Sequence, residues 1–461
     1  MKQLQLIFSN IPILFLTFTI TLFSPAKTLA DKNTDLDNWQ YGDLPNTLVL
    51  AMDGVPFQMV EALSEEGYFS EFFPPTKLVS TFPSMTDVAF GEIFAMEPTE
   101  GYQQVYYSYE KEKVIGSLGS EMFKLEDFER HFDAIVHDKS HLLTLYLTSY
   151  RAARKEWNNI EKTFFETRDK PVFYGYIAGS DAIGHRFGPK GLSKHLREID
   201  TNINDLREEY YQRTDRELNV IILSDHGNTL VKGKLIDFSE ALKSAGFSVN
   251  SRVTNDNSVA TTVAGVVGYL ALYSREENTK ALAAATINVE GVDLVMYRNS
   301  EGTTNSIVIE GADGVALVEY DPVNDKGSYL TLTGDPLGYG SVIPTDGTPL
   351  SQHEIFRRTT DSTYPNAIYR IYRCFYGSVK NPATVIASLQ PGYEFSSKII
   401  KSASIISKRW GTHGGLHRAD SLGVYMRTDR PSENISADAM ATEIDLDTFK
   451  EAQQEQLVIR D

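Results

Sequence analysis

The chain has 461 residues, of which 41% are hydrophobic and 23% charged, and its formal net charge is −18. A chain of this length and ordinary composition predicts more than one domain, or one large domain that carries an insertion. The strong negative charge argues against nucleic acid or an anionic membrane surface as a general partner. Cys374 is the single cysteine, which excludes an internal disulfide and a cysteine-based metal site.

The first 30 residues are typical of a secretory signal peptide. Met1-Lys2 precedes an apolar segment from about Leu4 to Phe23, and small residues at 24–26 or 28–30 offer cleavage sites. This pattern predicts a signal peptide over residues 1–30 and a periplasmic or secreted protein. The apolar segment is long for a signal, so a retained N-terminal anchor stays open as the alternative.

The first predicted strand ends in a carboxylate. Residues 46–52 form an apolar run without alternation, and Asp53-Gly54 follows directly. A helix is expected over 57–67 and a short strand over 77–80. Pro83 suits the first turn of a helix that extends to about Met96, which would place Thr81 at or just before its N-terminus. The Thr81 hydroxyl could then be a helix cap or a nucleophile.

The segment between residues 98 and 170 has weaker patterns. Its tyrosines at 102, 106, 107 and 109 fit substrate stacking or a half-buried strand about equally well. His137 and His141 have helical spacing, but the Lys and Asp residues around them favour a solvated helix face over a metal site.

Two pairs of Asp and His follow two further apolar runs. Residues 172–177 predict a buried strand, and the loop expected over 179–185 carries Asp181 and His185 four residues apart. After a helix predicted over 192–212, the strand 219–223 leads to Asp225 and His226. The alternation of strand and helix predicts an α/β fold, with a mostly parallel, doubly wound sheet that has helices on both faces.

The pattern changes after a helix predicted over 238–245. Segments 265–273, 306–309 and 315–320 are β-like, and a helix is expected over 276–285. The catalytic core would resume at a Gly-rich loop that contains His413 and His417, with a strand over 423–426. We therefore expect a core over 31–245 and 400–461 and a smaller inserted α+β cap subdomain over 246–399.

The polar side chains at these predicted loops suit two metal ions. The carboxylate, imidazole and hydroxyl groups, without thiolate, favour Zn²⁺, with Mn²⁺ or Fe as alternatives. Seven groups are too many for one tetrahedral ion, and two ions roughly 4 Å apart can hold the attacking and leaving oxygens of a displacement at phosphorus. The candidates are Asp53, Thr81, Asp181, His185, Asp225, His226 and His413.

In their order, these motifs resemble the alkaline phosphatase superfamily, and within it the type I phosphodiesterase/nucleotide pyrophosphatase branch. The resemblance implies that Asp181, His185 and His413 bind one metal, which holds the water of the second step. It implies that Asp53, Asp225, His226 and the Thr81 hydroxyl bind the other, and that Thr81 attacks phosphorus to form a phosphothreonine. Ser84 stands where nucleotide-cleaving relatives have an Asn that holds a phosphate oxygen, so Ser84 is a weaker candidate for substrate binding.

The function expected from the resemblance is the cleavage of phosphate diesters or pyrophosphate bonds in small phosphorylated substrates. The lack of an Arg beside Thr81 in the sequence favours a diester over a monoester. The same lack argues against a sulfatase, whose nucleophile requires a nearby Arg. The alternatives are a phosphomonoesterase, a phosphonate hydrolase, or a non-catalytic binding protein that keeps the fold. Stable membrane insertion is expected only if the N-terminal segment is retained.

Overall fold

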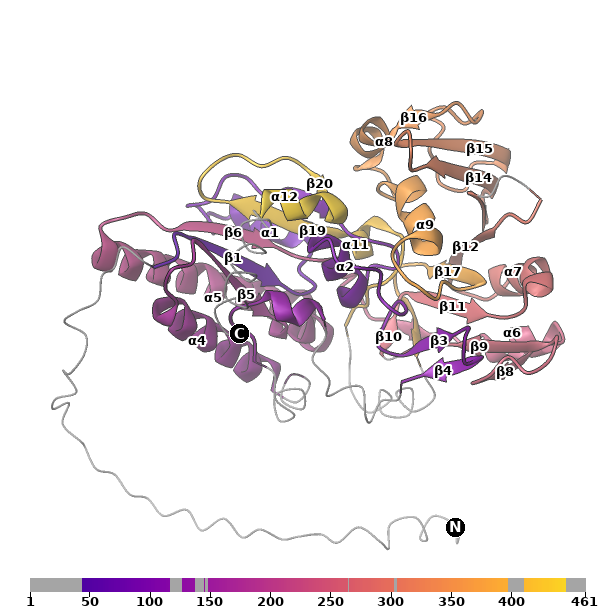
Figure 1. Cartoon of the computed structure of the whole chain (residues 1–461), viewed down its shortest axis with the longest axis horizontal. Coiled ribbons are helices and arrows are strands. Elements are labelled where there is room, and N and C mark those ends of the chain that lie inside the picture. The colour runs from indigo at the N-terminus through magenta and orange to yellow at the C-terminus, as the bar shows by residue number, and fades with distance from the viewer. Residues whose placement is uncertain are drawn as a thin grey trace, which may run out of the picture. The chain divides into compact units, whose positions relative to one another are not determined.

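We describe the fold from a computed structural model, which defines residues 44–116, 127–136, 145, 148–263, 265–301, 305–396 and 410–444. The predicted signal peptide, His137 and His141 lie outside these residues. Two large β-sheets dominate the described part of the chain (Figure 1).

The first sheet has six strands in the order β20-β2-β19-β6-β1-β5. All of them run in the same direction except β19, which is antiparallel to both β2 and β6. The mostly parallel sheet expected from the sequence is therefore confirmed. The strands are β1 (Thr47–Met52), β2 (Thr76–Val79), β5 (Val172–Ile177), β6 (Asn219–Leu223), β19 (Leu422–Arg427) and β20 (Ile435–Ser436).

Helices cover both faces of this sheet, as the doubly wound prediction requires. Alternate residues of β1 belong to two different hydrophobic clusters: Leu48 and Leu50 pack on one face, and Val49 and Ala51 on the other. This double burial explains why the strand has no polar alternation. The first face carries α1 (Phe57–Glu65), α4 (Ser149–Glu166) and α5 (Gly179–Thr214). The second carries α2 (Thr86–Ile93), η3 (Phe128–His131), η5 (Ala437–Ala439) and α12 (Met440–Glu443).

The second sheet has nine strands in the order β16-β15-β14-β13-β12-β17-β11-β9-β8, and only the β8–β9 pair is parallel. Its strands are β8 (Ser248–Asn250), β9 (Ser258–Thr261), β11 (Tyr269–Tyr273), β12 (Val292–Arg298), β13 (Ser306–Gly311), β14 (Gly314–Asp321), β15 (Lys326–Gly334), β16 (Leu350–Ser351) and β17 (Val385–Leu389). The helices of the same segment are η4 (Glu276–Asn278), α7 (Thr279–Ile287), α8 (Gln352–Thr359) and α9 (Ala367–Tyr376). We call this sheet and these helices the β lobe.

Smaller elements join the two sheets. The strands β7 (Lys234–Leu235), β18 (Tyr393–Ser396) and β10 (Val266–Val267) form a three-stranded sheet, and β3 (Tyr106–Ser108) pairs with β4 (Lys113–Ile115). The remaining helices are α6 (Ser239–Ser244) and α11 (Arg418–Ser421). All nine strands of the β lobe fall within 246–399, but the division into a core and a cap remains a prediction.

Two helices begin at residues other than those expected. The loop predicted over 179–185 is wrong, because α5 starts at Gly179 and continues past a break at Gly188, which has φ 65° and is followed by Pro189. The helix expected to start near Pro83 begins only at Thr86.

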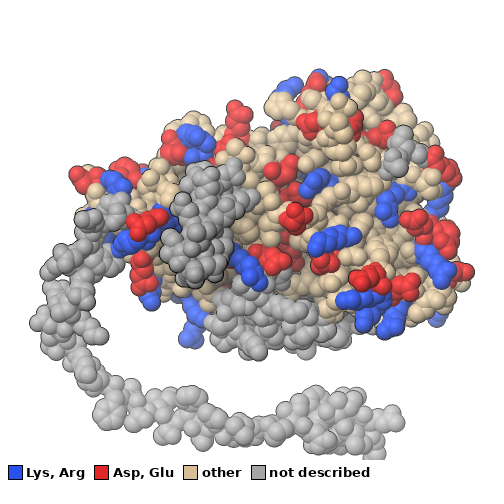
Figure 2. Space-filling model, viewed as in Figure 1, with Lys and Arg blue, Asp and Glu red and all other residues tan. Residues whose placement is uncertain are grey.

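The surface carries mixed charges. Figure 2 shows Lys and Arg interspersed with Asp and Glu on the face drawn. Among the helices of the described ranges, none combines the length and the hydropathy needed to cross a bilayer.

Candidate metal centre

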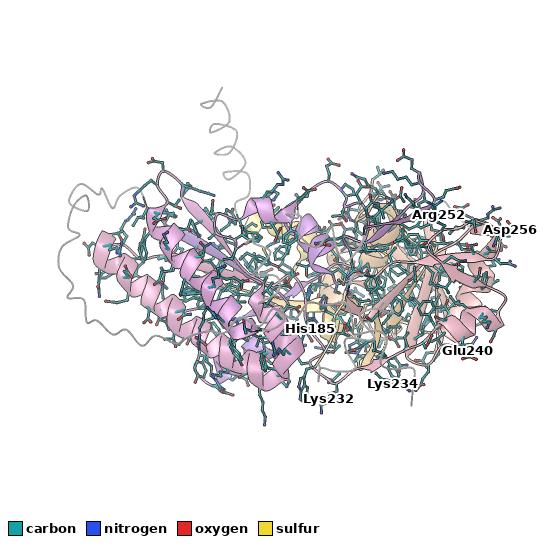
Figure 3. All side chains as sticks on the ribbon, turned by 90° about the horizontal axis from the view of Figure 1, so that it is seen from below. His185, Lys232, Lys234, Glu240, Arg252 and Asp256 are labelled. Carbon is teal, nitrogen blue, oxygen red and sulfur yellow. The ribbon has the colours of Figure 1, made fainter. Side chains whose placement is uncertain are left out.

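The predicted metal ligands meet at the carboxyl ends of three neighbouring parallel strands. Asp53 follows β1, Asp225 and His226 follow β6, and α5 begins directly after β5. In open α/β sheets this edge is where ligands bind. The loop before α11 adds His413. Figure 3 shows His185 where the helices of the six-stranded sheet meet the rest of the described chain, with Lys232 and Lys234 lower in this view.

The first group of ligand atoms comes from Asp181, His185 and His413, and these atoms all lie within 4.8 Å of one another. Asp181 and His185 are one helical turn apart in α5, which brings His185 Nε2 to 3.1 Å from Asp181 Oδ2. His413 Nε2 lies 4.0 Å from the other carboxylate oxygen, Oδ1. Asp181 and His185 are therefore brought together by a helix and not by a loop.

The second group comes from Asp53, Asp225 and His226, again within 4.8 Å. His226 Nε2 lies 3.4 Å from Asp53 Oδ1 and 3.3 Å from Asp225 Oδ2. Tyr176 donates a hydrogen bond of 2.7 Å to Asp53 Oδ2, which fixes that carboxylate.

The two groups are adjacent. The rings of His226 and His413 stack with centroids 3.9 Å apart. The backbone of Gly54 lies between the groups: its N–H donates to Asp225 Oδ1 at 3.2 Å. A Cβ atom at Gly54 would lie 2.5 Å from Asp181 Oδ1, so this position with φ 64° requires glycine.

All three histidines present the same nitrogen to the site. Nδ1 of His185, His226 and His413 lies 2.8–3.0 Å from the backbone oxygen of Gly411, Gly227 and Ser84, respectively. A carbonyl can only accept, so Nδ1 carries a proton, and Nε2 is the nitrogen that can bind a metal once it is deprotonated. This arrangement is how metal-binding histidines are oriented in proteins.

The electrostatics of the centre favour a bound cation. Burial and the nearby carboxylates of Asp225 and Asp181 raise the pKa of Asp53 well above its usual value. Burial raises the pKa of Asp225 to about 7 and lowers that of His413 to about 3. Burial opposes a charge on His185, yet the carboxylate of Asp181 beside it raises the His185 pKa to about 9.

The residues present fit a pair of divalent metal ions. Asp225 Oδ2 is buried and has no hydrogen-bond partner in the described structure, which is costly unless a cation or donor meets it. Each group supplies carboxylate oxygen and imidazole nitrogen, the donor set of Zn²⁺ sites without cysteine. The two groups are therefore candidate metal sites, and the identity of the metal is a proposal.

The hydroxyl next to the second group belongs to Thr86, which the sequence analysis did not select. Thr86 Oγ1 lies 3.4 Å from Asp53 Oδ1 and 3.3 Å from His226 Nε2, and Thr86 is the first residue of α2. Thr81 Oγ1 instead donates to the carbonyl of Pro83 at 2.8 Å. Because α2 begins at Thr86 and not near Pro83, Thr86 is a second candidate hydroxyl beside Thr81, whose role stays a prediction.

Ser84 has a different environment from the one expected. It is fully buried, and its hydroxyl donates to the carbonyls of Thr81 and Gly415. Its own carbonyl accepts from His413 Nδ1. The geometry thus assigns Ser84 to the support of His413, while its role in substrate binding stays an untested prediction.

An arginine that sequence reasoning missed lies beside Thr81. Arg370 of α9 donates from Nη2 to the Thr81 carbonyl at 2.7 Å. This hydrogen bond goes to the Thr81 backbone carbonyl and not to the Thr81 hydroxyl. His417 accepts from the Ala419 N–H and caps α11, which accounts for this second histidine of the loop without a metal.

Comparison with known proteins gives a match to the family model for type I phosphodiesterase/nucleotide pyrophosphatase over residues 94–301. That range contains Asp181, His185, Asp225 and His226. Two relatives are members 7 of the ectonucleotide pyrophosphatase/phosphodiesterase family, 35% identical (human) and 31% identical (rat) over 100 residues. These matches cover 20% of this chain and 22% and 23% of the relatives, respectively.

Among solved structures, human ectonucleotide pyrophosphatase/phosphodiesterase 5 is similar with a TM-score of 0.50 and 10% sequence identity. The match covers 87% of this chain and 95% of that structure. At this identity the likeness concerns the fold, and it agrees with the α/β sheet and flanking helices described above.

Proposed function

We propose that this chain is a metal-dependent hydrolase of phosphate diesters or pyrophosphate bonds, of the type I phosphodiesterase/nucleotide pyrophosphatase family whose model matches residues 94–301. The observation that carries the proposal is the convergence of six ligand residues in two adjacent groups next to one threonine hydroxyl. Since the relatives are matched over a small part of their length, the activity itself rests on this geometry and on the test below.

In the proposed site, Asp181, His185 and His413 hold one metal ion, and Asp53, Asp225 and His226 hold the other. Bound divalent ions, which we expect to be Zn²⁺, would stabilise negative charge on the phosphoryl oxygens and lower the pKa of a coordinated hydroxyl or water. The carbonyls of Gly411, Gly227 and Ser84 keep the proton on Nδ1, so each imidazole offers Nε2.

We propose Thr86 as the nucleophile in place of Thr81. Its hydroxyl lies against Asp53 and His226, and the N-terminus of α2 favours an anion at this position. Thr86 Oγ would attack phosphorus and release the alcohol or phosphate leaving group. Water would then cleave the new Oγ–P bond and regenerate the hydroxyl, which is the expected phosphothreonine route.

The preference for a diester remains the one expected from the sequence, which has no Arg beside Thr81. A phosphomonoesterase or phosphonate hydrolase is the alternative, and the comparison of substrates below separates the two.

The decisive experiment compares Thr86→Ala with Thr81→Ala on bis-p-nitrophenyl phosphate and p-nitrophenyl phosphate. We expect Thr86→Ala to lose diesterase activity by about 10³-fold or more, as for the loss of other nucleophiles. Thr81→Ala should keep most activity, because it loses only the hydrogen bond to Pro83. Chelation should abolish activity and added Zn²⁺ should restore it. Faster cleavage of the monoester would contradict the diesterase assignment, and no cleavage of either substrate would favour a binding protein.

The N-terminal sequence supports a secreted or periplasmic location, which we propose together with cleavage of residues 1–30. Mass spectrometry of the protein purified from an exporting host would test it. An intact Met1 or Lys2 on the mature protein would contradict cleavage.

A further inference from the structure

Arg370 is a buried arginine that the proposed mechanism does not use. It lies in α9, a helix of the β lobe, and it is 3% exposed. Burying a guanidinium is costly unless its N–H groups are paired with acceptors. The partners of this side chain therefore indicate what its burial achieves for the structure.

The hydrogen bonds of Arg370 join two segments that are far apart in the sequence. Nη2 donates to the Thr81 carbonyl at 2.7 Å and lies 3.2 Å from Ser84 Oγ, both in the segment before α2. Nη2 also donates to Ser421 Oγ at 2.7 Å, and Nη1 donates to the Leu416 carbonyl at 3.2 Å. One planar side chain therefore holds together the segment before α2 and the segment around α11.

These two segments hold His413 from both sides. His413 Nδ1 donates to the Ser84 carbonyl at 2.9 Å, and Ser84 Oγ donates to the Gly415 carbonyl at 3.1 Å. The Gly415 N–H donates in turn to the Asp420 carboxylate at 3.3 Å. The orientation of the His413 imidazole therefore depends on the two segments that Arg370 joins.

Asp420 is the buried carboxylate that interacts with the charge of Arg370. It is 2% exposed. Burial raises the pKa of Asp420 to about 7, while the Gly415 N–H and the guanidinium of Arg370 act against this rise. Arg370 thus also favours the ionised form of the carboxylate, which accepts the Gly415 N–H more strongly than the neutral form does.

The second group of candidate ligands is held by other contacts. Tyr176 donates to Asp53, and the Gly54 N–H donates to Asp225. In the described structure the hydrogen bonds of Arg370 go to neither of these segments. Loss of the Arg370 side chain should therefore affect the His413 group more than the second group.

From these contacts we propose that Arg370 is a positioning residue for His413, through which the β lobe sets the affinity of the first ligand group for its metal ion. The inference rests on the proposed two-metal centre. Arg370 does not reach the ion in this scheme, because its hydrogen bonds end on backbone and hydroxyl oxygens. Contacts that hold a metal ligand in place typically change metal affinity by about 10- to 100-fold.

The test is a titration of the metal-free, full-length protein with Zn²⁺ in competition with a chromogenic chelator, which measures two binding steps. We expect Arg370→Met to bind one ion about tenfold more weakly or worse and the other ion as the wild type does. An equal loss at both steps would indicate a general loss of structure and would overturn the proposal.

A double variant tests whether Arg370 acts through His413. His413→Ala removes the ligand itself and identifies the affected binding step, which a weaker chelator measures. Arg370→Met combined with His413→Ala should bind this ion no more weakly than His413→Ala alone, because the two losses overlap. Losses that add in full would show that Arg370 acts on the ion by another route, which contradicts the proposal.

Arg373→Met is the matched control. Arg373 lies one turn later in α9 and donates from Nη2 to Glu92 Oε1 of α2 at 2.5 Å, so it also links the β lobe to the rest of the described chain. In that structure its side chain bonds to Glu92 and not to the segments that Arg370 joins. Arg373→Met should bind both ions as the wild type does.

Arg370→Lys is the conservative variant. It keeps the positive charge near Asp420 and part of the donor capacity, so it should fold and show the same selective loss to a smaller extent. If Arg370→Met does not fold, Arg370→Lys decides, and unchanged affinity for both ions would overturn the proposal. A wild type that binds fewer than two ions would instead refute the two-metal centre itself.

Discussion

Gly54 separates the two groups of candidate metal ligands at close range. A Cβ atom there would overlap Asp181 Oδ1, and the φ of 64° already disfavours a side chain. We predict that Gly54→Ala weakens metal binding about tenfold or more, because it displaces a ligand of one group and the N–H that supports the other. Elemental analysis after dialysis would compare the metal content of Gly54→Ala with that of the wild type.

Gly67→Ala is the matched control for this substitution. Gly67 also has a positive φ of 94°, but no atom lies within 4 Å of its added Cβ. Both variants should lose about 1–2 kcal/mol of stability from backbone strain. Equal metal content in the two variants would show that Gly54 does not organise the centre.

Tyr176 orients Asp53 through its hydroxyl. We predict that Tyr176→Phe reduces metal affinity by about 10- to 100-fold, the range typical of groups that hold a metal ligand in place. The control is Tyr174→Phe in the same strand, since the Tyr174 hydroxyl donates to the Ile444 carbonyl, away from the site. Competition with a chromogenic chelator would measure both affinities. A larger loss in Tyr174→Phe would point to a general loss of stability.

Among the elements, α5 is the one that carries two ligands and then breaks. Gly188 has φ 65°, and a Cβ atom there would meet Trp410 Cδ2 at 2.6 Å, so Gly188→Ala should destabilise the protein by more than 1 kcal/mol. Gly184→Ala lies in the same helix with its nearest contact at 3.5 Å. It should be neutral or stabilise by up to about 1 kcal/mol, because alanine favours the helix. Thermal unfolding of the two variants compares them; similar melting temperatures would contradict the role of the break.

The strands could be predicted from the sequence because their burial on both faces leaves a continuous apolar run. The predicted strand 172–177 has the same limits as β5, and the predicted strand 219–223 the same limits as β6. Parallel strands place their carboxyl ends at one edge, so the Asp and His residues that follow could be grouped before any coordinates were known.

The start of α2 could not be predicted in the same way. Pro83 is compatible with a first helical turn, but the Ser84 hydroxyl and carbonyl bond to Gly415 and His413 from the far end of the chain. These contacts hold the segment extended until Thr86. The structure therefore offers Thr86 as a nucleophile candidate, five residues after Thr81. The contacts of Ser84 that determine this arrangement are with residues more than 300 positions away, which no local pattern reveals.

At the scale of the whole molecule, the segment that contains α8 and α9 contacts the six-stranded sheet and its helices through buried and charged groups that the sequence pattern did not indicate. Arg370 and Arg373 of α9 reach Thr81 and Glu92, and Lys77 pairs with Asp361. The predicted insertion had no assigned helix in this region. Its contact with the segment before α2 makes the lobe part of the structure that positions Thr86.

The folding stability of the protein should depend on pH and on bound metal through the candidate metal centre. The Asp225 pKa is raised to about 7 and the His185 pKa to about 9, so both groups hold protons more tightly in the folded protein than when unfolded. In the metal-free protein, the contribution of these two groups to the free energy of unfolding is fully present at low pH. It declines for Asp225 between about pH 4 and 7, and for His185 between about pH 6.5 and 9.

Metal ions need the deprotonated forms of these ligands, so the sign reverses when metal is bound. We predict that the difference in melting temperature between Zn²⁺-loaded and chelated protein increases from pH 6 to pH 8. Scanning calorimetry at matched ionic strength measures it, and Asp225→Asn is the comparison, because its amide does not titrate and binds metal poorly. In that variant the difference should be smaller and its rise with pH weaker. A wild-type difference that is constant or falls with pH would mean that Asp225 and His185 do not hold the ion.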